Sequence, residues 1–480
     1  MCLVAGGLGS NLREKFIVMI NAGKHRGEDS FGVWTDEGVM KSSDFSKVHE
    51  IPDGNIGLLQ CRLAMTGSLG FTQPFVNELA LIHNGEIYNH RELRAWLEGK
   101  GVSFETDVDS EVVLRLIEFF LDRGLDAFGA VRKAMLMMEG DYAVAFSDGE
   151  RIHLFRDPLG VRPLYRSPEG FFASEKKVLW AIGQEAIPVA PGELVTISRE
   201  GVEVRKAFRL EELKRKPLSQ EGAVKAIGRT LTCSVRHRVG KKTGVLFSGG
   251  LDSSLVALIA SEYSDVVLYT AGMEGSPDME WARRAADKLG LELREYVFDL
   301  EDVKEAVPKV AFAIEEPNPM NMAIGIPLYF ATKLAGDEGV KVLLSGQGAD
   351  ELFGGYTKYL ERPELMEEDL KELGERNLAR DDKIAMLNSV EGRFPFLSLS
   401  VVSAAINTPL DAKISGGVRK AALRKAALEL GLPEEIAMRE KKAAQYGSGS
   451  QKLLEKLAKS EGLGLREYAE KVFREIFKRE

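Results

Sequence analysis

Cysteine is scarce in this chain, with only Cys2, Cys61 and Cys233 among 480 residues. A small, odd number of cysteines excludes a disulfide framework and is typical of a reduced, cytoplasmic protein. Long apolar runs are also lacking, because none reaches the roughly 18 residues that a membrane-spanning helix needs. The first residues have no basic start before their apolar stretch, so we expect no signal peptide. Cys61 and Cys233 are expected to pack in the interior.

A basic excess is missing as well, since the formal net charge is −9. Nucleic acid is therefore not an expected partner, because binding it usually requires a basic face. The chain also has no glycine-rich loop ending in Gly-Lys-Ser/Thr, which argues against a kinase-type γ-phosphate site.

The length predicts about two to four domains. A homodimer is a possible assembly that the sequence does not decide.

The first half of the chain contains short apolar runs separated by glycine turns, a pattern typical of strands. Examples are residues 58–63 and 142–146, while residues 90–99 and 109–123 have helical spacing of apolar side chains. These observations predict an α+β domain over residues 1–195. The highly charged residues 196–222 are interpreted as a linker.

From residue 223 onwards strands alternate with helices, which predicts a parallel sheet covered on both faces. After about residue 360 the pattern is nearly all helical. The second domain is therefore predicted to be α/β with a helical C-terminal part. The expected helices are 223–238 and 278–289, and the expected strands are 245–247, 266–270, 294–298 and 340–344.

A glycine-rich loop, Ser248-Gly-Gly-Leu-Asp-Ser-Ser254, follows a predicted strand and opens a predicted helix. Glycines let backbone N–H groups approach an anion, and the helix N-terminus adds partial positive charge. A second loop, Ser345-Gly-Gln-Gly-Ala-Asp350, also follows an apolar strand. Ligands bind at the carboxyl ends of strands in open α/β sheets. The sequence thus predicts a nucleotide site between two loops, each with an aspartate.

Cys2 would become the first residue if the initiator methionine is removed. A terminal cysteine carries a thiol nucleophile and an α-amine with a reference pKa near 7.7–8.0, the two groups that N-terminal nucleophile catalysis needs. Other motifs follow in a fixed order in the first half. They are Arg26-Gly-Glu-Asp29, Arg62-Leu63, His83-Asn-Gly-Glu86, Thr106-Asp-Val-Asp109, Arg156-Asp-Pro and Phe172-Ala-Ser-Glu175.

In this order the motifs resemble the class II glutamine amidotransferase domain, which implies an N-terminal-nucleophile αββα fold. The resemblance implies that Cys2 attacks the glutamine amide, with Asn84 and Gly85 forming the oxyanion hole. It further implies that Arg62 binds the glutamine carboxylate and that Glu86 and Asp109 bind its ammonium group.

The second half resembles the ATP-pyrophosphatase domain of asparagine synthetases and their relatives, including β-lactam synthetases. Lys420-Ala-Ala-Leu-Arg424 and Arg439-Glu-Lys441 extend that resemblance. It implies Mg²⁺ bound by Asp252 and Asp350, Lys441 stabilising negative charge, and Glu391 available as a base. Residues 447–450 look like a mobile, closing segment. The ATP-binding residues implied are Leu246, Ser248, Gly249, Gly250, Asp252, Ser253, Ala271, Ser345 and Gly346.

Together the halves imply that glutamine is hydrolysed to glutamate and ammonia, and that ATP activates aspartate as an acyl-adenylate. Ammonia then forms asparagine, with AMP and pyrophosphate released. A dry internal passage for ammonia is expected. Around the acceptor pocket, however, Gln347 stands where asparagine synthetases usually carry Glu. Lys383, beside Asp382, replaces an Arg, and Ser398 replaces an Asp.

Three hypotheses therefore remain open. The first is a glutamine-dependent asparagine synthetase. The second is an ATP-dependent amidotransferase acting on another carboxylate, and the third is a regulator that senses glutamine or ATP. Intact Cys2, Asp252, Asp350 and Lys441 count against the third.

Overall fold

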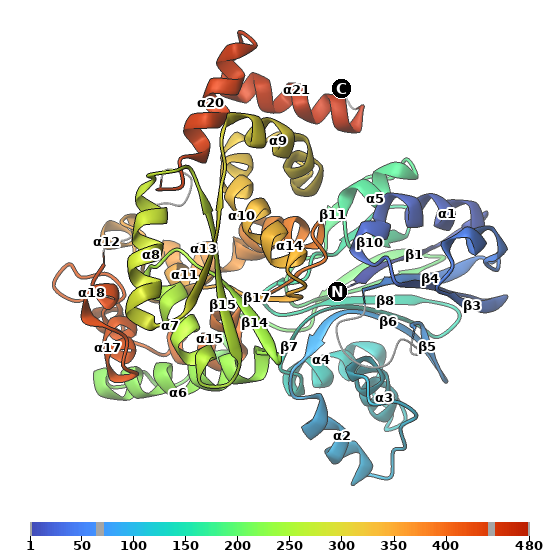
Figure 1. Ribbon diagram of the computed structural model, residues 1–480. Helices are drawn as coiled ribbons and strands as arrows, with labels where there is room; N and C mark the ends of the chain where they lie inside the picture. The colour runs from blue at the N-terminus through green and yellow to red at the C-terminus, as the bar shows by residue number, and fades with distance from the viewer. Residues whose placement is uncertain (1, 64–71, 440–446, 479–480) are drawn as a thin grey trace. The chain divides into compact units, whose positions relative to one another are not determined.

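The structure is a computed structural model that describes residues 2–63, 72–439 and 447–478. The chain divides into two compact units, residues 1–212 and 213–480 (Figure 1). Each unit has its own sheets and its own hydrophobic core, so each is described by itself.

The first unit contains two antiparallel sheets. Within the described residues, the larger has the strand order β11-β9-β10-β1-β4-β2-β3 and the smaller β13-β12-β8-β7-β6-β5. The larger sheet consists of β1 (Cys2–Leu8), β2 (Ser30–Thr35), β3 (Gly38–Ser42), β4 (Ile56–Arg62), β9 (Tyr165–Arg166), β10 (Phe171–Ala173) and β11 (Ile187–Pro188). The smaller consists of β5 (Phe75–Val76), β6 (Ala80–Ile87), β7 (Gly140–Ser147), β8 (Ile152–Arg156), β12 (Glu193–Ser198) and β13 (Gly201–Lys206).

Helices cover the outer faces of both sheets. Two pack on the larger sheet and three lie on the side of the smaller one, which gives the expected αββα layers (Figure 1). They are α1 (Leu12–Gly23), α5 (Lys176–Ala181), α2 (His90–Glu98), α3 (Asp109–Leu121) and α4 (Ala127–Met137).

Alternation along β1 explains why Cys2 lies between the two sheets. Leu3 packs with the α1-side core, whereas Val4 packs with the core between the sheets. Side chains two residues apart in a strand share a face, so Cys2 shares the inner face of Val4. Gln60 and Arg62 of β4 pair with Val4 and Cys2 and therefore lie on the same inner face.

The predicted linker, residues 196–222, differs from what the structure shows. Strand β13 (Gly201–Lys206) pairs with β12 at the edge of the smaller sheet, and the two units divide after residue 212. The charges at Glu203 and Arg205 lie on an exposed edge strand. Charged edge strands resist pairing with other chains, so a dense run of charge here marks an edge and not a linker.

The second unit contains a parallel sheet with the order β16-β15-β14-β17-β18. Its strands are β14 (Lys242–Leu246), β15 (Asp265–Gly272), β16 (Glu292–Val297), β17 (Val342–Leu344) and β18 (Glu391–Arg393). The longer helices are α6 (Gln220–Arg238), α7 (Leu251–Ser261), α8 (Pro277–Leu289), α9 (Leu300–Ile314), α10 (Pro319–Asp337), α13 (Leu365–Leu373), α14 (Ala379–Met386), α15 (Leu399–Ile406), α17 (Ala421–Glu429), α20 (Ser450–Ser460) and α21 (Leu465–Phe477). Shorter ones are α11 (Ala349–Phe353), α12 (Lys358–Glu361), α16 (Leu410–Lys413) and α18 (Glu434–Ala437).

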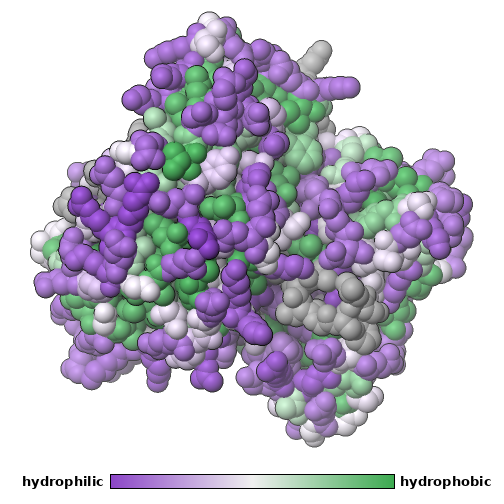
Figure 2. Space-filling view, viewed as in Figure 1, coloured by the Kyte–Doolittle hydropathy of each residue, from purple (hydrophilic) through white to green (hydrophobic). Residues whose placement is uncertain are grey.

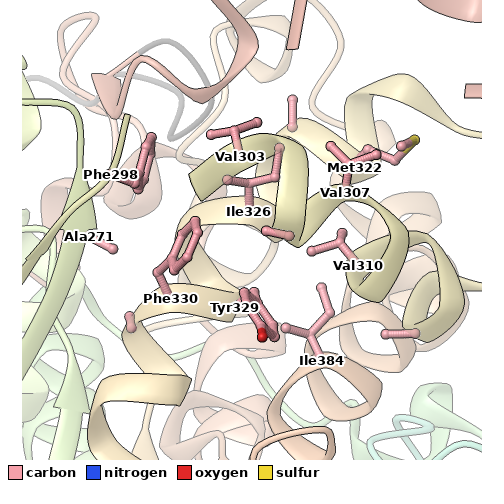
Figure 3. Packing of buried hydrophobic residues seen from close by; sticks show 14 of the residues in the cluster. Ala271, Phe298, Val303, Val307, Val310, Met322, Ile326, Tyr329, Phe330 and Ile384 are labelled. Carbon is pink, nitrogen blue, oxygen red and sulfur yellow. The ribbon is translucent and has the colours of Figure 1, made fainter. Parts of the chain in front are cut away.

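Helices α9 and α10 enclose a large apolar core beside this sheet (Figure 3). The ring of Phe330 stacks on Phe298 with centroids 5.3 Å apart and meets Tyr329 edge-on at 5.4 Å. Full burial of each such side chain contributes roughly 1.5–3 kcal/mol to folding. Helices α7 and α8 contact the same strands, so the sheet is buried, as strand–helix alternation predicts.

Strand β18 was not expected, because the chain after residue 360 reads as helical. Its sequence, Glu391-Gly-Arg393, has no apolar run. The strand is nevertheless buried, because Arg393 Nε donates to Glu391 Oε1 at 2.7 Å and this ion pair neutralises the two charges. The strand pairs with β17, which is distant in sequence, and local pattern cannot anticipate that pairing.

Among the described residues, no helix is long and apolar enough to cross a membrane. The face seen in Figure 2 is dominated by hydrophilic residues, with hydrophobic ones in small scattered groups.

Candidate active sites

The first site is built around Cys2, the first residue of β1. Its backbone N–H donates to Asn84 Oδ1 at 3.0 Å, so the bond joins β1 of one sheet to β6 of the other. Cys2 and Asn84 are both buried. Because Asn84 Oδ1 accepts this bond, the amide is oriented with Nδ2 turned away from the Cys2 nitrogen.

Asn84 Nδ2 is buried and has no hydrogen-bond partner among the described residues. A buried N–H donor without a partner is costly in a folded protein unless a ligand uses it. The next residue, Gly85, has φ 143°, and a Cβ there would lie 1.9 Å from the Asp141 carbonyl oxygen. Only glycine fits at this position, and the hydrogen bond from Cys2 places the Asn84-Gly85 pair beside Cys2.

The Cys2 carbonyl is held by a buried charge cluster that sequence reasoning did not assign. Arg26 Nε donates to Cys2 O at 3.3 Å, and its NH1 donates to Glu175 Oε1 at 2.8 Å. His25 and Lys177 lie 2.9 and 2.5 Å from the other Glu175 oxygen. Burial alone would raise the pKa of Glu175, but these cations hold it well below its usual value. The sequence did contain a signal for this cluster, because Arg26 and Glu175 belong to two of the quoted motifs.

The predicted glutamine-binding residues lie at the end of β4, near the end of β6 and at the start of α3. Arg62 is the last residue of β4 and pairs directly with Cys2. Asp109 begins α3, and its Oδ2 accepts from the backbone N–H of Ile87, which follows Glu86 in β6. The fold therefore ties Asp109 to the strand end that carries Glu86. A cation and two carboxylates are what an α-amino acid requires for recognition.

The other two cysteines have different environments. Cys61 is buried, and burial raises the pKa of its thiol. That places it among packing cysteines, as expected. Cys233 lies on α6 and is exposed, so the expectation that it packs in the interior is wrong.

The second site begins at the loop between β14 and α7. Gly249 adopts φ 65°, and a Cβ there would lie 2.8 Å from Trp281 Cδ1. Trp281 Nε1 donates to the Gly249 carbonyl at 2.7 Å, and Arg439 NH1 donates to the Ser248 carbonyl at 2.9 Å. Two carbonyl groups of the loop are thus fixed by hydrogen bonds, one from Trp281 of α8 and one from Arg439.

Hydroxyl groups and the start of α7 lie together in this loop. Ser248 Oγ and Ser253 Oγ are 3.3 Å apart, and the Gly250 N–H lies 3.4 Å from Ser248 Oγ. Gly250 is the N-cap of α7, which places Asp252 in the first turn. Hydroxyls and N–H groups at a helix N-terminus can bind phosphate oxygens.

The second loop touches the first one. A Cβ at Gly346 would lie 2.8 Å from Asp252 Cβ and 3.0 Å from the Ser253 nitrogen, so this contact requires glycine. Ser345 Oγ, in turn, accepts from the Gln347 N–H at 3.3 Å. The contact lies between β14 and β17, where the strand order reverses. Ligands bind at such a switch point in doubly wound sheets.

Leu246 and Ala271, predicted to frame adenine, lie at the carboxyl ends of the central strands. Leu246 ends β14 and pairs with Tyr269, and Ala271 follows two residues later in β15. Both therefore lie at the strand ends from which the glycine loops leave.

Asp252 and Asp350 converge on one cation, the Lys420 ammonium. Lys420 Nζ lies 2.8 and 2.7 Å from the two Asp252 oxygens and 2.8 Å from Asp350 Oδ1. Burial would lower the pKa of Lys420, but the two aspartates raise it above its usual value. The two carboxylates can therefore share one positive charge, and hard oxygen donors of this kind fit Mg²⁺.

Lys383, predicted in the acceptor pocket, is committed to an internal ion pair. Its Nζ lies 2.6 Å from Glu315 Oε2, and both side chains are buried. Its neighbour Asp382 is also buried on α14. Glu391, proposed as a base, is held by Arg393 and pairs with Val342 at the start of β17, while the glycine loop leaves the other end of that strand.

Lys441 lies outside the described residues. The expectation that residues 447–450 form a mobile segment is wrong for their described positions. Ser448 and Ser450 are buried, Ser448 O accepts from the Met273 N–H at 2.9 Å, and Ser450 Oγ donates to Ala323 O at 2.6 Å. Glycine and serine here serve close packing, since a Cβ at Gly447 would lie 1.9 Å from Asp278 Oδ2.

Comparison with known sequences gives matches to both halves. A family model described as asparagine synthase matches residues 226–365 and 358–477, and one described as a glutamine amidotransferase domain matches residues 1–206. The chain is 36% identical over 536 aligned residues to a putative glutamine-hydrolysing asparagine synthetase of Methanocaldococcus jannaschii, covering 96% of each chain. It is 30% identical to a probable one of Dictyostelium discoideum, covering 92% of this chain and 83% of that one. Among solved structures, a B. subtilis glutamine phosphoribosylpyrophosphate amidotransferase is 21% identical with a TM-score of 0.39, covering 57% of this chain and 67% of that one.

Proposed function

Because this chain belongs to the glutamine-hydrolysing asparagine synthetase family, we propose that it converts aspartate, glutamine and ATP to asparagine, glutamate, AMP and pyrophosphate. The enzyme is an ATP-dependent carbon–nitrogen ligase with glutamine as amido donor. Ammonia released at Cys2 is used at the site between the two glycine loops.

In the first half, Cys2 is the nucleophile and attacks the glutamine amide carbon. The negative charge that develops on the oxygen is stabilised by Asn84 Nδ2 and the Gly85 N–H. The buried, partnerless Nδ2 supports this role. Arg62 binds the substrate carboxylate, and Glu86 and Asp109 bind its ammonium group.

In the second half, the first loop and the start of α7 bind the phosphates of ATP, with Leu246 and Ala271 beside the adenine. Asp252 and Asp350 hold Mg²⁺, which supplies positive charge to the phosphate oxygens. The aspartate side-chain carboxylate displaces pyrophosphate and becomes an acyl-adenylate. Ammonia then attacks the acyl carbon and AMP leaves. Lys441 stabilises negative charge during these steps.

The strongest support for this proposal is that the two glycine loops meet where the strand order reverses, and that Asp252 and Asp350 share the Lys420 ammonium. The test is a stoichiometry measurement on purified protein without Met1. Asparagine, AMP and pyrophosphate should appear in equal amounts and only when all three substrates are present, with at least as much glutamate. Glutamate formed without asparagine would contradict an aspartate acceptor.

A second candidate is amidation of a different carboxylate, favoured by the buried Lys383–Glu315 pair. The charge of Lys383 is neutralised by Glu315 inside the protein and is not offered to a substrate carboxylate. The Gln347 amide cannot act as a base at neutral pH. A Gln347→Glu variant distinguishes the candidates. A lower KM for aspartate in this variant would mean that the natural pocket is tuned for another acceptor, while an unchanged KM would remove this argument.

A further inference from the structure

Lys420 reaches the two predicted metal ligands from a separate helix. Its ammonium contacts both oxygens of Asp252 and one of Asp350 at 2.7–2.8 Å, and its side chain is 5% exposed. Asp252 follows β14, Asp350 follows β17, and Lys420 immediately precedes α17. Three segments distant in sequence thus converge on one positive charge.

The backbone around Lys420 is shaped to allow this reach. Lys420 itself adopts a left-handed φ of 58°, which is unusual for a residue with a long side chain. A Cβ at Gly355 would lie 2.4 Å from Lys420 Cε and 1.8 Å from Asp350 Oδ1. Glycine at 355 therefore leaves the space through which the lysine stem passes. Strain and a required glycine at one contact indicate a built arrangement and not a chance surface pair.

The ammonium and a metal ion need the same oxygen lone pairs. A carboxylate oxygen that accepts from Lys420 Nζ at 2.7 Å has less capacity for a cation, and two positive charges so close would repel. A divalent ion therefore has to displace the lysine from at least one aspartate. Lysine suits such an exchange, since its charge is a compact group on a flexible stem.

We propose that Lys420 is an internal cation that occupies the metal position of Asp252 and Asp350 in the free enzyme, so that the metal enters only together with nucleotide phosphates. The negative phosphates offer the displaced ammonium new partners, which makes the exchange favourable only when nucleotide is present. The inference rests on the proposed function, because it takes the two aspartates as the metal ligands of the ATP site.

The test is a Mn²⁺ titration of the full chain without nucleotide, with free Mn²⁺ read by electron paramagnetic resonance. The wild type should bind no Mn²⁺ at this site at submillimolar concentration. Lys420→Met should bind one Mn²⁺ per chain with a Kd at least ten-fold lower than that of the wild type. Added Mg²⁺ should compete with Mn²⁺ for this site. Adding Asp252→Asn to Lys420→Met should remove the binding. Mn²⁺ should also raise the unfolding temperature of Lys420→Met and not that of the wild type.

Lys358→Met is the matched control, because Lys358 pairs with Asp369 at 2.5 Å and not with Asp252 or Asp350. Its Mn²⁺ binding should stay at the wild-type level. If Lys420→Met does not fold, Lys420→Gln carries the same expectation. Equal Mn²⁺ binding by wild type and variant would overturn the role of Lys420. The titration with ATP, in which protein-bound Mn²⁺ is counted by equilibrium dialysis because ATP itself binds Mn²⁺, separates the two proposals. A wild type that binds Mn²⁺ with ATP supports the ATP site whatever Lys420 does, and one that does not overturns both.

Discussion

The Cys2 backbone nitrogen and Asn84 Oδ1, 3.0 Å apart, join the two sheets of the first unit at the proposed nucleophile. One amide group serves two purposes in this arrangement. In the proposed mechanism, its oxygen holds the residue that attacks, and its nitrogen donates to the substrate oxygen that becomes negatively charged.

Asn84→Asp should therefore lower the glutaminase kcat by roughly 10²–10³, the usual effect of losing one oxyanion donor. The carboxylate keeps the bond to the Cys2 nitrogen but offers no N–H to the oxyanion. Asparagine formation from added ammonium chloride should be unchanged, which serves as the internal control. Equal losses with glutamine and with ammonia would mean that Asn84 acts on the fold and not on the oxyanion.

Lys383→Met should reduce the free energy of unfolding of the second unit by about 3–5 kcal/mol, because it leaves Glu315 buried without its cation. Urea denaturation followed by circular dichroism measures this change. Removing both charges in Lys383→Met/Glu315→Gln should restore much of the loss. If Lys383 instead binds the acceptor carboxylate, the single variant will keep its stability and raise only the acceptor KM.

Gly346→Ala should separate the two loops, since its Cβ would lie 2.8 Å from Asp252 Cβ. A displacement of about 1 Å can change rates by up to 10²-fold, so we expect kcat/KM for ATP to fall at least roughly ten-fold. Glutaminase activity should be unaffected. Gly228→Ala is the control, because its Cβ would meet only Leu430 Cδ1 at 3.9 Å. Similar ATP kinetics in both variants would show that the close approach is not needed.

His153 should make the first unit less stable in acid. Burial lowers its pKa from 6.5 to about 4, and its ring stacks on Phe146. Between these pH values the unfolded chain binds a proton that the folded one does not, so the free energy of unfolding falls as pH falls from 6.5 to 4. At about 1.4 kcal/mol per pKa unit the loss approaches 3 kcal/mol.

The measurement is urea denaturation from pH 4 to pH 8 for the wild type and His153→Gln. Asp157, whose pKa burial raises to about 6, gives a slope of opposite sign. It is present in both proteins, so their difference isolates His153. Parallel curves would contradict the assignment.

Most of the fold follows from sequence pattern. Strand–helix alternation placed β14 to β17, α6 and α8 within a few residues, because these elements have apolar runs and clear turns. β18 and the β13 edge were missed because neither has an apolar run: β18 pairs with the distant β17, and β13 is a charged strand at the edge of its sheet.

Site residues show the same contrast between local sequence pattern and distant contacts. Loops that carry their own chemistry, such as Ser248–Gly250 and Asn84-Gly85, could be predicted from motifs. Residues that act by reaching into a site from elsewhere could not be assigned a role: Lys420 and Arg439 lie in quoted motifs, yet their targets, Asp252 and Ser248, are known only from the fold.

The central claim is that one chain joins glutamine hydrolysis to adenylation of aspartate. A single reaction with amide-¹⁵N glutamine, carboxylate-¹⁸O aspartate and Mg-ATP tests it, with products read by mass spectrometry. We expect ¹⁵N in asparagine and one ¹⁸O in AMP, because the acyl-adenylate passes a carboxylate oxygen to the nucleotide. Unlabelled AMP, or ADP in its place, would contradict it.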